Sequence, residues 1–334
     1  MLSDSIIIDL DKAPNNKISI TRIYERIEIV PLDNLGRGNL SQLSELSVTM
    51  DKFYFKCGDS MIVSYSQDGR LIDSLSFGSL VTDYFIFNDS ILNLLAEKEF
   101  ISYFLPDNSL MKRTFLETPI ALTKIAREDE NVVLFSGYNG SNDYSCKYYL
   151  DKNVFSEAQG QINYSNITKI AEGIHYFNYC DHLYKLYPHS GCIWECGDFH
   201  HQFLNPIFKK KNSGGIEFRS AQITDNKIYY SLLINDKECL LILNRADRAY
   251  SMLLNGEERE FTVHGANKKY LLINKSREGV HLPLGVIRDG INYFYCSSSD
   301  LYRYLTRDLL DSQNAEMMDV AVKKKNNVVI KYFL

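Results

Sequence analysis

The sequence contains no long apolar run. Its opening segment, MLSDSIIIDLDKAPNN, is continuously apolar only at Ile6, Ile7 and Ile8, between Asp4 and Asp9. A secretory signal needs roughly 7–15 apolar residues after a basic start, and a membrane span needs about 18 or more. We therefore expect no transmembrane segment, and a chain that is either cytoplasmic or has had an export signal removed.

The sequence also lacks the motifs of several common enzyme sites. It holds no G-x-S-x-G, no P-loop and no G-x-G-x-x-G pattern, so phosphate cradling and hydride transfer have no support. The net charge of −5 excludes a domain-wide basic field, and the lysine runs at 209–211 and 323–325 are short. We expect no nucleic-acid partner.

Proline, glycine and cysteine are sparse. The 7 Pro and 18 Gly exclude collagen-like sequence, and the 7 Cys leave at least one unpaired. The densest Cys and His cluster, at 175–201, includes Cys192, Cys196 and His200. In a strand, residues four apart are separated by about 13 Å, too far for shared zinc ligation or a disulfide. We expect these residues, and the single tryptophan Trp194, to pack within or between β-sheets rather than to bind a metal or a ligand.

Aromatic residues are abundant, with 23 Tyr and 18 Phe, and these types favour strands. Residues 43–77 divide into four short strands, LSELSVT, KFYFKC, MIVSYS and RLIDSL. The separating stretches are Met50-Asp51, Gly58-Asp59-Ser60 and Gln67-Asp68-Gly69, and Gly and Asp supply turn conformations that bulkier residues resist. The segment therefore predicts a four-stranded antiparallel meander.

The same pattern recurs at 82–117, 120–158, 166–199 and 216–254, with an insertion at 209–215 and a longer second turn at 139–143 in the third copy. Four strands in a period of about 40 residues are typical of a β-propeller. We expect one all-β domain over 1–334: a six-bladed propeller of four-stranded antiparallel blades.

The sixth blade is expected at about 284–334 together with 25–32. Residues 25–32 and the closing VVIKYFL are strands without a partner nearby in sequence, so one blade closed by the N-terminal strand accommodates both. Between them, residues 301–327 break the alternation and predict a short helical insertion. Residues 255–283 fit the repeat poorly, and KYLLINK is either an extra strand or part of blade six.

The chain resembles exported bacterial six-bladed β-propeller proteins of unknown function, relatives of the NHL-repeat propellers. The resemblance is carried by IDLDK, ISITRIYERIEIVPLD, KFYFKCGDSMIVSYSQDGRLIDSL and NNVVIKYFL, and spans nearly the whole chain. The family's glycine-rich loop is degraded here to SFGSLVTDYFIF. Members usually carry a lipoprotein-type signal, so the resemblance implies a periplasmic or outer-membrane-attached protein with its signal removed, while a cytoplasmic location stays open.

Turns joining the second and third strands of the blades carry carboxylates, which predicts an acidic rim on the face where propellers often bind ligands. The candidate binding residues are Asp59, Tyr138, Asn142, Asp143, Tyr179, Asp181, Asp236 and Asp300, with Glu97, Glu99 and Glu238 in equivalent turns. The alternative is that Asp and Asn are there as turn formers and the tyrosines as strand formers.

Two functions fit these observations. The favoured one is a monomeric, non-enzymatic binding propeller that recognises a glycan or a protein at the cell envelope, without a cofactor; calcium is the one ion that the acidic rim suggests. The other is a metal- or carboxylate-dependent hydrolase or lyase with its site at the mouth of the central channel. Fold alone does not choose between them, and the sequence identifies no catalytic residue.

Overall fold

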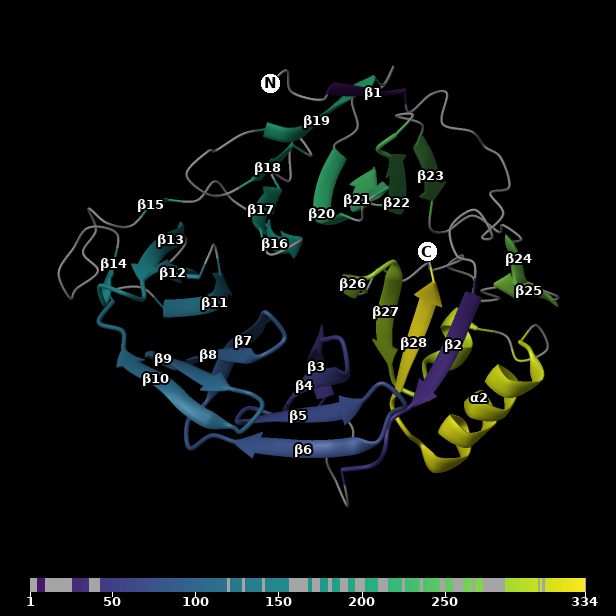
Figure 1. The fold of residues 1–334 in the computed structure, drawn as a ribbon. Coiled ribbons are helices and arrows are strands. Elements are labelled where there is room, and N and C mark those ends of the chain that lie inside the picture. The colour runs from purple at the N-terminus through teal and green to yellow at the C-terminus, as the bar shows by residue number, and fades with distance from the viewer. Residues whose placement is uncertain are drawn as a thin grey trace. The chain divides into compact units, whose positions relative to one another are not determined.

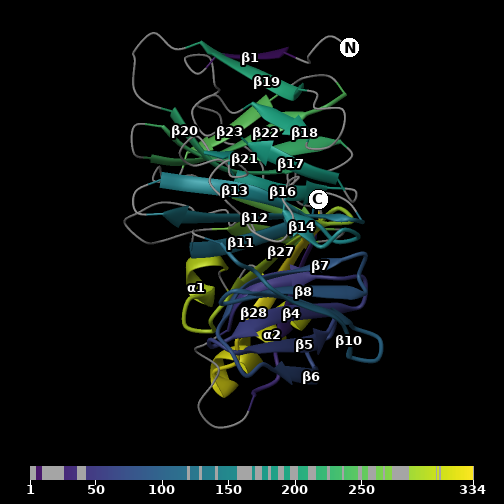
Figure 2. The same ribbon diagram turned by 90° about the vertical axis from the view of Figure 1, so that its left-hand side faces the viewer.

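The computed structural model describes the chain in segments. The described residues are 5–9, 26–35, 43–118, 121–127, 130–139, 142–155, 168–169, 175–179, 182–186, 192–195, 202–209, 216–223, 226–234, 237–246, 250–254, 261–265, 268–272, 286–305, 307 and 310–333. Figures 1 and 2 show the elements of these segments from two directions. Within them, no helix has the length and apolar character needed to cross a bilayer.

Antiparallel sheets of four or five strands repeat along the described chain, as the alternating sequence predicts. The first three are β3 (Leu43–Val48), β4 (Lys52–Cys57), β5 (Met61–Ser66) and β6 (Leu71–Ser76); β7 (Val81–Phe87), β8 (Ile91–Ala96), β9 (Glu99–Phe104) and β10 (Ser109–Phe115); and β11 (Ala121–Arg127), β12 (Val132–Asn139), β13 (Asn142–Tyr149), β14 (Val154–Phe155) and β15 (Thr168–Lys169). In each, the first four strands follow one another in space in sequence order.

The later sheets continue the pattern with two variations. They are β16 (His175–Tyr179), β17 (His182–Leu186), β18 (Ile193–Glu195) and β19 (Gln202–Lys209), with β1 (Ser5–Asp9) beside β19; β20 (Ile216–Ile223), β21 (Lys227–Ile234), β22 (Lys237–Asn244) and β23 (Tyr250–Leu254); and β26 (Val286–Arg288), β27 (Ile291–Cys296), β28 (Val328–Phe333) and β2 (Arg26–Pro31). The separate pair β24 (Phe261–Gly265) and β25 (Lys268–Leu272) accounts for the first four residues of the unplaced KYLLINK segment: they form a strand outside both neighbouring sheets.

The chain divides into two compact units. One consists of 1–5, 59–61 and 76–206, and the other of 6–58, 62–75 and 207–334. Each has its own core. The first is built on β8, β9 and β11–β13 around Phe100, Phe135 and Tyr148. The second packs β2, β27 and β28 against α1 (Leu301–Tyr304) and α2 (Ser312–Lys324).

The first strand of four sheets carries a β-bulge. The pairing shifts between Ser44 and Ser47 in β3, Val81 and Asp83 in β7, Leu122 and Lys124 in β11, and Phe218 and Ser220 in β20. In β7 the extra residue is Thr82, one step from the pair Val81–Ala96 that precedes the β8–β9 turn. Because a bulge bends its strand and redirects a side chain, the repeat reshapes the edge where the second-to-third-strand turns lie.

In the second unit, the second strand of the chain and the last one share a sheet. β2 pairs antiparallel with β28 over its whole length, from Arg26–Phe333 to Pro31–Val328, and the two arrows lie side by side in Figure 1. The predicted partnership of the two unpartnered sequence strands is therefore present. The predicted helical insertion is also present, as α1 and α2 between β27 and β28.

Within this unit, the sheet of β3–β6 is tied to that of β26–β28 and β2. The Asp33 N–H donates to the Gly69 carbonyl at 2.8 Å, and buried Lys331 donates to the Gln67 carbonyl and to Glu28 Oε1, both at 3.0 Å. Gly69 has φ +87°, and a Cβ there would lie 2.1 Å from the Pro31 carbonyl oxygen. Only glycine fits this turn.

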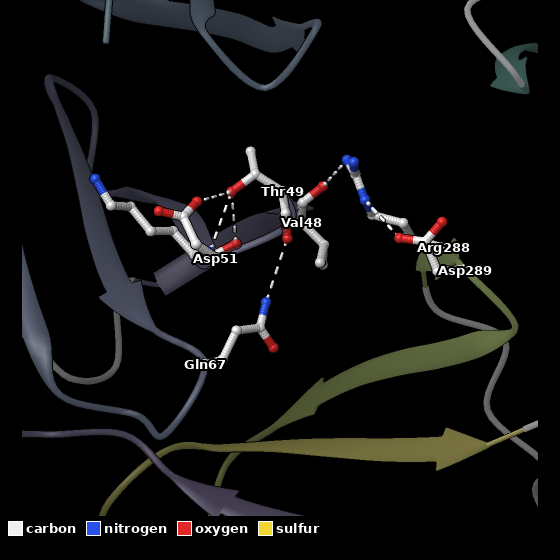
Figure 3. Close-up of polar contacts among 7 residues, drawn as sticks. Val48, Thr49, Asp51, Gln67, Arg288 and Asp289 are labelled. Atoms are coloured by element: carbon white, nitrogen blue, oxygen red, sulfur yellow. Dashed lines mark hydrogen bonds and ion pairs between the residues drawn. The ribbon is translucent and has the colours of Figure 1, made fainter. Parts of the chain in front are cut away.

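The same two sheets meet again at the β3–β4 turn, shown in Figure 3. Arg288, next to the β26–β27 turn, donates from Nη1 to the Val48 carbonyl at 3.1 Å, and Gln67 donates from Nε2 to the Thr49 carbonyl at 3.3 Å. Asp51 accepts from the Thr49 hydroxyl and so stabilises the turn. These groups satisfy one another, which makes this cluster structural.

Helix α2 covers the outer edge of β2. Asn314, 7% exposed, accepts from the Ile29 N–H at 2.8 Å and donates from Nδ2 to the Ile27 carbonyl at 3.1 Å. The side-chain amide of Asn314 thus pairs with one backbone N–H and one backbone carbonyl on the free edge of β2. Without it, these two groups would be open to pairing with another strand. Asp311 is the N-cap of this helix, and its carboxylate accepts from the Asn314 N–H at 2.8 Å.

One predicted turn is wrong. The sequence predicted a long loop at 139–143, but β12 runs to Asn139 and β13 begins at Asn142, and these two residues pair. Asn142 and Asp143 are therefore strand residues, because continued pairing satisfies their backbone groups as a long loop cannot. The strand β1 was not predicted either. The inserted lysine loop lies outside the described residues from 210 to 215.

Candidate binding site

A pocket lies beside the β8–β9 turn of the first unit. Its volume is about 550 Å³, within the range of small-molecule sites. The lining residues are Thr82, Ala96, Glu97, Lys98, Glu99, Phe115, Thr118, Ala121 and Leu122. They come from β7, the β8–β9 hairpin, the end of β10 and the start of β11, so the pocket forms where one sheet passes to the next.

The turn at the pocket is held on both sides by backbone hydrogen bonds. The Glu97 N–H donates to the Leu80 carbonyl at 3.0 Å, before β7, and the Leu116 N–H donates to the Lys98 carbonyl at 2.6 Å, after β10. The segments that enter and leave the sheet therefore clamp this turn. A site fixed in this way loses little conformational entropy on binding.

The backbone at Glu97 is left-handed, with φ 52°. Glycine, asparagine and aspartate adopt this conformation more readily than glutamate. Uncommon conformations of this kind are concentrated at functional sites. The turn therefore has a glutamate at a position where glycine, asparagine or aspartate would adopt the backbone conformation more readily.

Charged groups of both signs surround the pocket. Glu97 and Lys98 are exposed at the turn. Glu99 forms a two-pronged ion pair with Arg113, with Nε–Oε1 at 3.1 Å and Nη2–Oε2 at 2.7 Å. The hydrogen bonds that Arg113 donates to Glu99 raise the pKa of the Arg113 guanidinium. The four side chains together carry no net charge.

Phe115 supplies an aromatic wall. It is the last residue of β10, opposite Glu99 in the strand register, and its side chain is 60% exposed. The floor is apolar and buried, with Ala96 0% and Leu122 6% exposed. Leu122 also belongs to the core around Phe100 and Phe135. The arrangement combines an accessible ring, a rigid floor and hydrogen-bonding groups at the rim.

For two of the predicted rim residues, Asp59 and Asp300, the structure gives the exposure or hydrogen bonds of the residue. Asp59 is exposed in the β4–β5 turn, and its carbonyl accepts from the Val81 N–H at 2.7 Å. Asp300 directly precedes α1 and accepts from the Ser297 hydroxyl at 2.7 Å. Both have structural roles, and a binding role for them stays a prediction.

The other predicted residues are placed by their strands alone. Tyr138 and Asp143 are register partners across the β12–β13 hairpin, next to the pair Asn139–Asn142. Tyr179 ends β16. Asp181 and Asp236 lie outside the described residues. The structure thus brings Tyr138, Asn142 and Asp143 to the end of one hairpin.

The rim pattern identified Glu97 and Glu99, but sequence reasoning missed Lys98, Arg113, Phe115 and Thr82. Phe115 appears in the sequence as an ordinary outer-strand aromatic, and its exposure is set by neighbouring strands. The two glutamates on either side of Lys98 were the only local signal. In the part of the chain that the structure describes, no group of three or more His, Cys, Asp or Glu residues could hold a metal ion.

Comparison with known proteins supports the fold. No family model and no curated protein sequence matches the chain. A crystal structure from Bacteroides fragilis, of a protein assigned as exported, matches over 98% of both chains with a TM-score of 0.67 and 10% identity. This likeness shows a common fold.

Two further solved structures are less similar. The extracellular domain of a protein assigned as a one-component system from B. thetaiotaomicron has a TM-score of 0.41 and 10% identity, over 75% of this chain and 34% of that one. The β-propeller domain of Cps50 from Myceliophteria thermophila has a TM-score of 0.44 and 14% identity, over 69% and 79%. The expected fold class, mostly β with four-stranded antiparallel sheets and a helix near the C-terminus, is confirmed by the described elements.

Proposed function

We propose that this protein is a non-enzymatic, glycan-binding β-propeller of the bacterial cell envelope. Its six blades would be 43–77, 82–117, 120–158, 175–209, 216–254 and 284–334 with 25–32. The fourth blade was expected at 166–199, but β15 pairs with β13 of the third sheet and β19 pairs with β18. The repeated four-strand order and the β2–β28 pairing support this arrangement. The likeness to an exported Bacteroides protein supports the location.

The pocket at the β8–β9 turn is the observation that carries the binding role. An exposed ring offers dispersion and weak C–H contacts to the apolar face of a sugar, and carboxylates and cations bind hydroxyl groups. A protein partner is less consistent with this lining, because the cores of protein interfaces are depleted in Lys and Glu.

A glycan array with the labelled full chain tests the proposal. The array should hold bacterial cell-wall and host glycans, and should be read with the wild type, with Phe115→Ala and with Phe104→Ala. Phe104 is 38% exposed on β9 but does not line the pocket, so it is the matched control.

We expect one glycan class to bind the wild type and the control but not Phe115→Ala. An array without any bound glycan would contradict the proposal and would direct the search to a protein partner. Binding retained in Phe115→Ala would contradict the site.

A further inference from the structure

From the lining of the pocket we infer its ligand class: one or two units of an uncharged saccharide, packed on Phe115 and read by Glu97 and Lys98. This inference rests on the proposed function and specifies it.

The charge balance of the rim carries the inference. Glu97 and Lys98 are adjacent in the turn, one negative and one positive. Glu99 and Arg113 neutralise each other through two hydrogen bonds. An anionic sugar would be attracted by Lys98 but repelled by Glu97, and a cationic sugar the reverse, so neither gains a net attraction that would offset the desolvation of its charge. Because like charges brought together at a binding site weaken binding and suppress the wrong partner, the rim favours a ligand without charge.

The two roles within the pocket are separable. Glu99 and Arg113 satisfy each other through their ion pair, and Glu99 lies opposite Phe115 in the strand register, so these two charges are less available to a ligand than those of the turn. Glu97 and Lys98 make no ion pair with each other or with other described residues, so their hydrogen-bonding groups are available. The turn that bears them is fixed at both ends. These two residues are therefore the ones that determine specificity.

The size of the pocket limits the ligand. A volume of about 550 Å³ accommodates a small molecule. Buried Ala96 and Leu122 close its floor. The site is thus built for a short unit of a glycan rather than for a long chain lying in an extended groove.

Isothermal titration of the full chain with disaccharides that differ in charge provides the test. The probes are N,N′-diacetylchitobiose, its deacetylated cationic form and anionic digalacturonate, with maltose, cellobiose and lactose as further neutral sugars. We expect a neutral disaccharide to bind at least tenfold more tightly than either charged probe. Its Kd should change less than twofold between 50 and 500 mM salt, because no net charge is neutralised.

Charge-swap variants sharpen the test. Lys98→Glu should shift the preference at least tenfold toward the cationic probe, and Glu97→Lys should shift it toward the anionic one. Phe115→Ala should raise the Kd at least tenfold, while Phe104→Ala should change it less than twofold.

Two outcomes separate this inference from the proposed function. A wild-type preference for a charged disaccharide, lost in Phe115→Ala, would overturn the inference and leave glycan binding standing. Charge swaps at Glu97 and Lys98 that leave the order of the probes unchanged would also overturn it. A glycan array without any binding would contradict both.

Discussion

Two strands at sheet edges, β2 and β10, differ in the exposure of their apolar side chains. On β2, Ile27 and Ile29 are 1% and 2% exposed, and α2 covers the edge through Asn314. On β10, Leu110, Met111 and Phe115 are 54%, 55% and 60% exposed. The first edge is closed by the protein itself, whereas the second leaves its apolar side chains in contact with solvent.

The open edge is nevertheless guarded against strand addition. The pairing of β10 with β9 shifts between Leu110 and Lys112, which marks a bulge at Met111, and Lys112 and Arg113 follow. Bulges and cations are the devices that keep edge strands from pairing with another chain. The exposed side chains of β10, with Phe115 at the pocket, are therefore available for binding while the backbone is protected.

The largest expected effect is at the turn that meets the end of β2. Gly69→Ala should lower the free energy of unfolding by about 3 kcal/mol or more, because a Cβ would meet the Pro31 carbonyl and φ is positive. Urea denaturation measures the change. Gly78→Ala is the control: a Cβ there has no neighbour within 4 Å, so the change should stay within about 0.5 kcal/mol. Equal effects at the two glycines would contradict this account.

A matched pair of truncations tests the comparison directly. Ile29→Ala on β2 should cost about 2–4 kcal/mol, since it empties part of a buried core. Leu110→Ala on β10 should cost about 0.5 kcal/mol or less, since its side chain is 54% exposed. Urea denaturation of both variants measures the two losses of stability. A Leu110 variant as unstable as the Ile29 variant would show that β10 is not an open edge.

Removing the cover of β2 should have a smaller but clear effect. Asn314→Ala leaves the Ile29 N–H and the Ile27 carbonyl without their side-chain partner, which should cost about 2 kcal/mol. Gln313→Ala, at an exposed position of the same helix, should be nearly neutral. Hydrogen exchange at Ile29 should accelerate in the Asn314 variant alone; unchanged protection would mean that α2 covers the edge by other contacts.

The last expected effect is absent at neutral pH, grows only at alkaline pH, and should be alike in both cores. Burial raises the pKa of Cys146, in the core beneath the pocket, and of Cys296, in the core beside β2, from 9.0 to about 12. Above pH 9 the unfolded chain loses these protons while the folded chain keeps them. Stability therefore falls as pH rises from 9 to 12, by up to about 1.4 kcal/mol per pH unit for each thiol, and below pH 9 the thiols have no effect.

Replacing both cysteines isolates their contribution from the other groups that titrate at high pH. The Cys146→Ala/Cys296→Ala variant should show a shallower loss of stability between pH 9 and 11 than the wild type in urea denaturation. Identical slopes would indicate that the thiols ionise as readily in the folded chain as in the unfolded one.

The local structure was largely predictable. Asp68-Gly69 forms the expected hairpin between β5 and β6, and Asn88-Asp89, both with positive φ, forms the one between β7 and β8. These turns depend on residue types that adopt left-handed backbone conformations, so short stretches are enough to identify them. The 139–143 loop was mispredicted because Asn and Asp are turn formers that a hairpin can also accommodate within strands.

The candidate site was only half predictable. Glu97 and Glu99 stand out in the sequence as carboxylates in a turn, but Phe115 is 16 residues from Glu99 and becomes its neighbour only when β9 and β10 pair. Likewise, Asn314 is separated from Ile29 by 285 residues. No local pattern encodes such distant contacts.

By itself, the sequence determined most of the strands and turns and the pairing of 25–32 with the closing strand, because alternation and turn chemistry act over a few residues. The tertiary structure decided which edge is covered and which is open. It also decided where the bulges fall and that Phe115, Glu97 and Lys98 surround one pocket. Exposure and pocket shape depend on the packing of segments far apart in the chain, and that packing exists only in the folded protein.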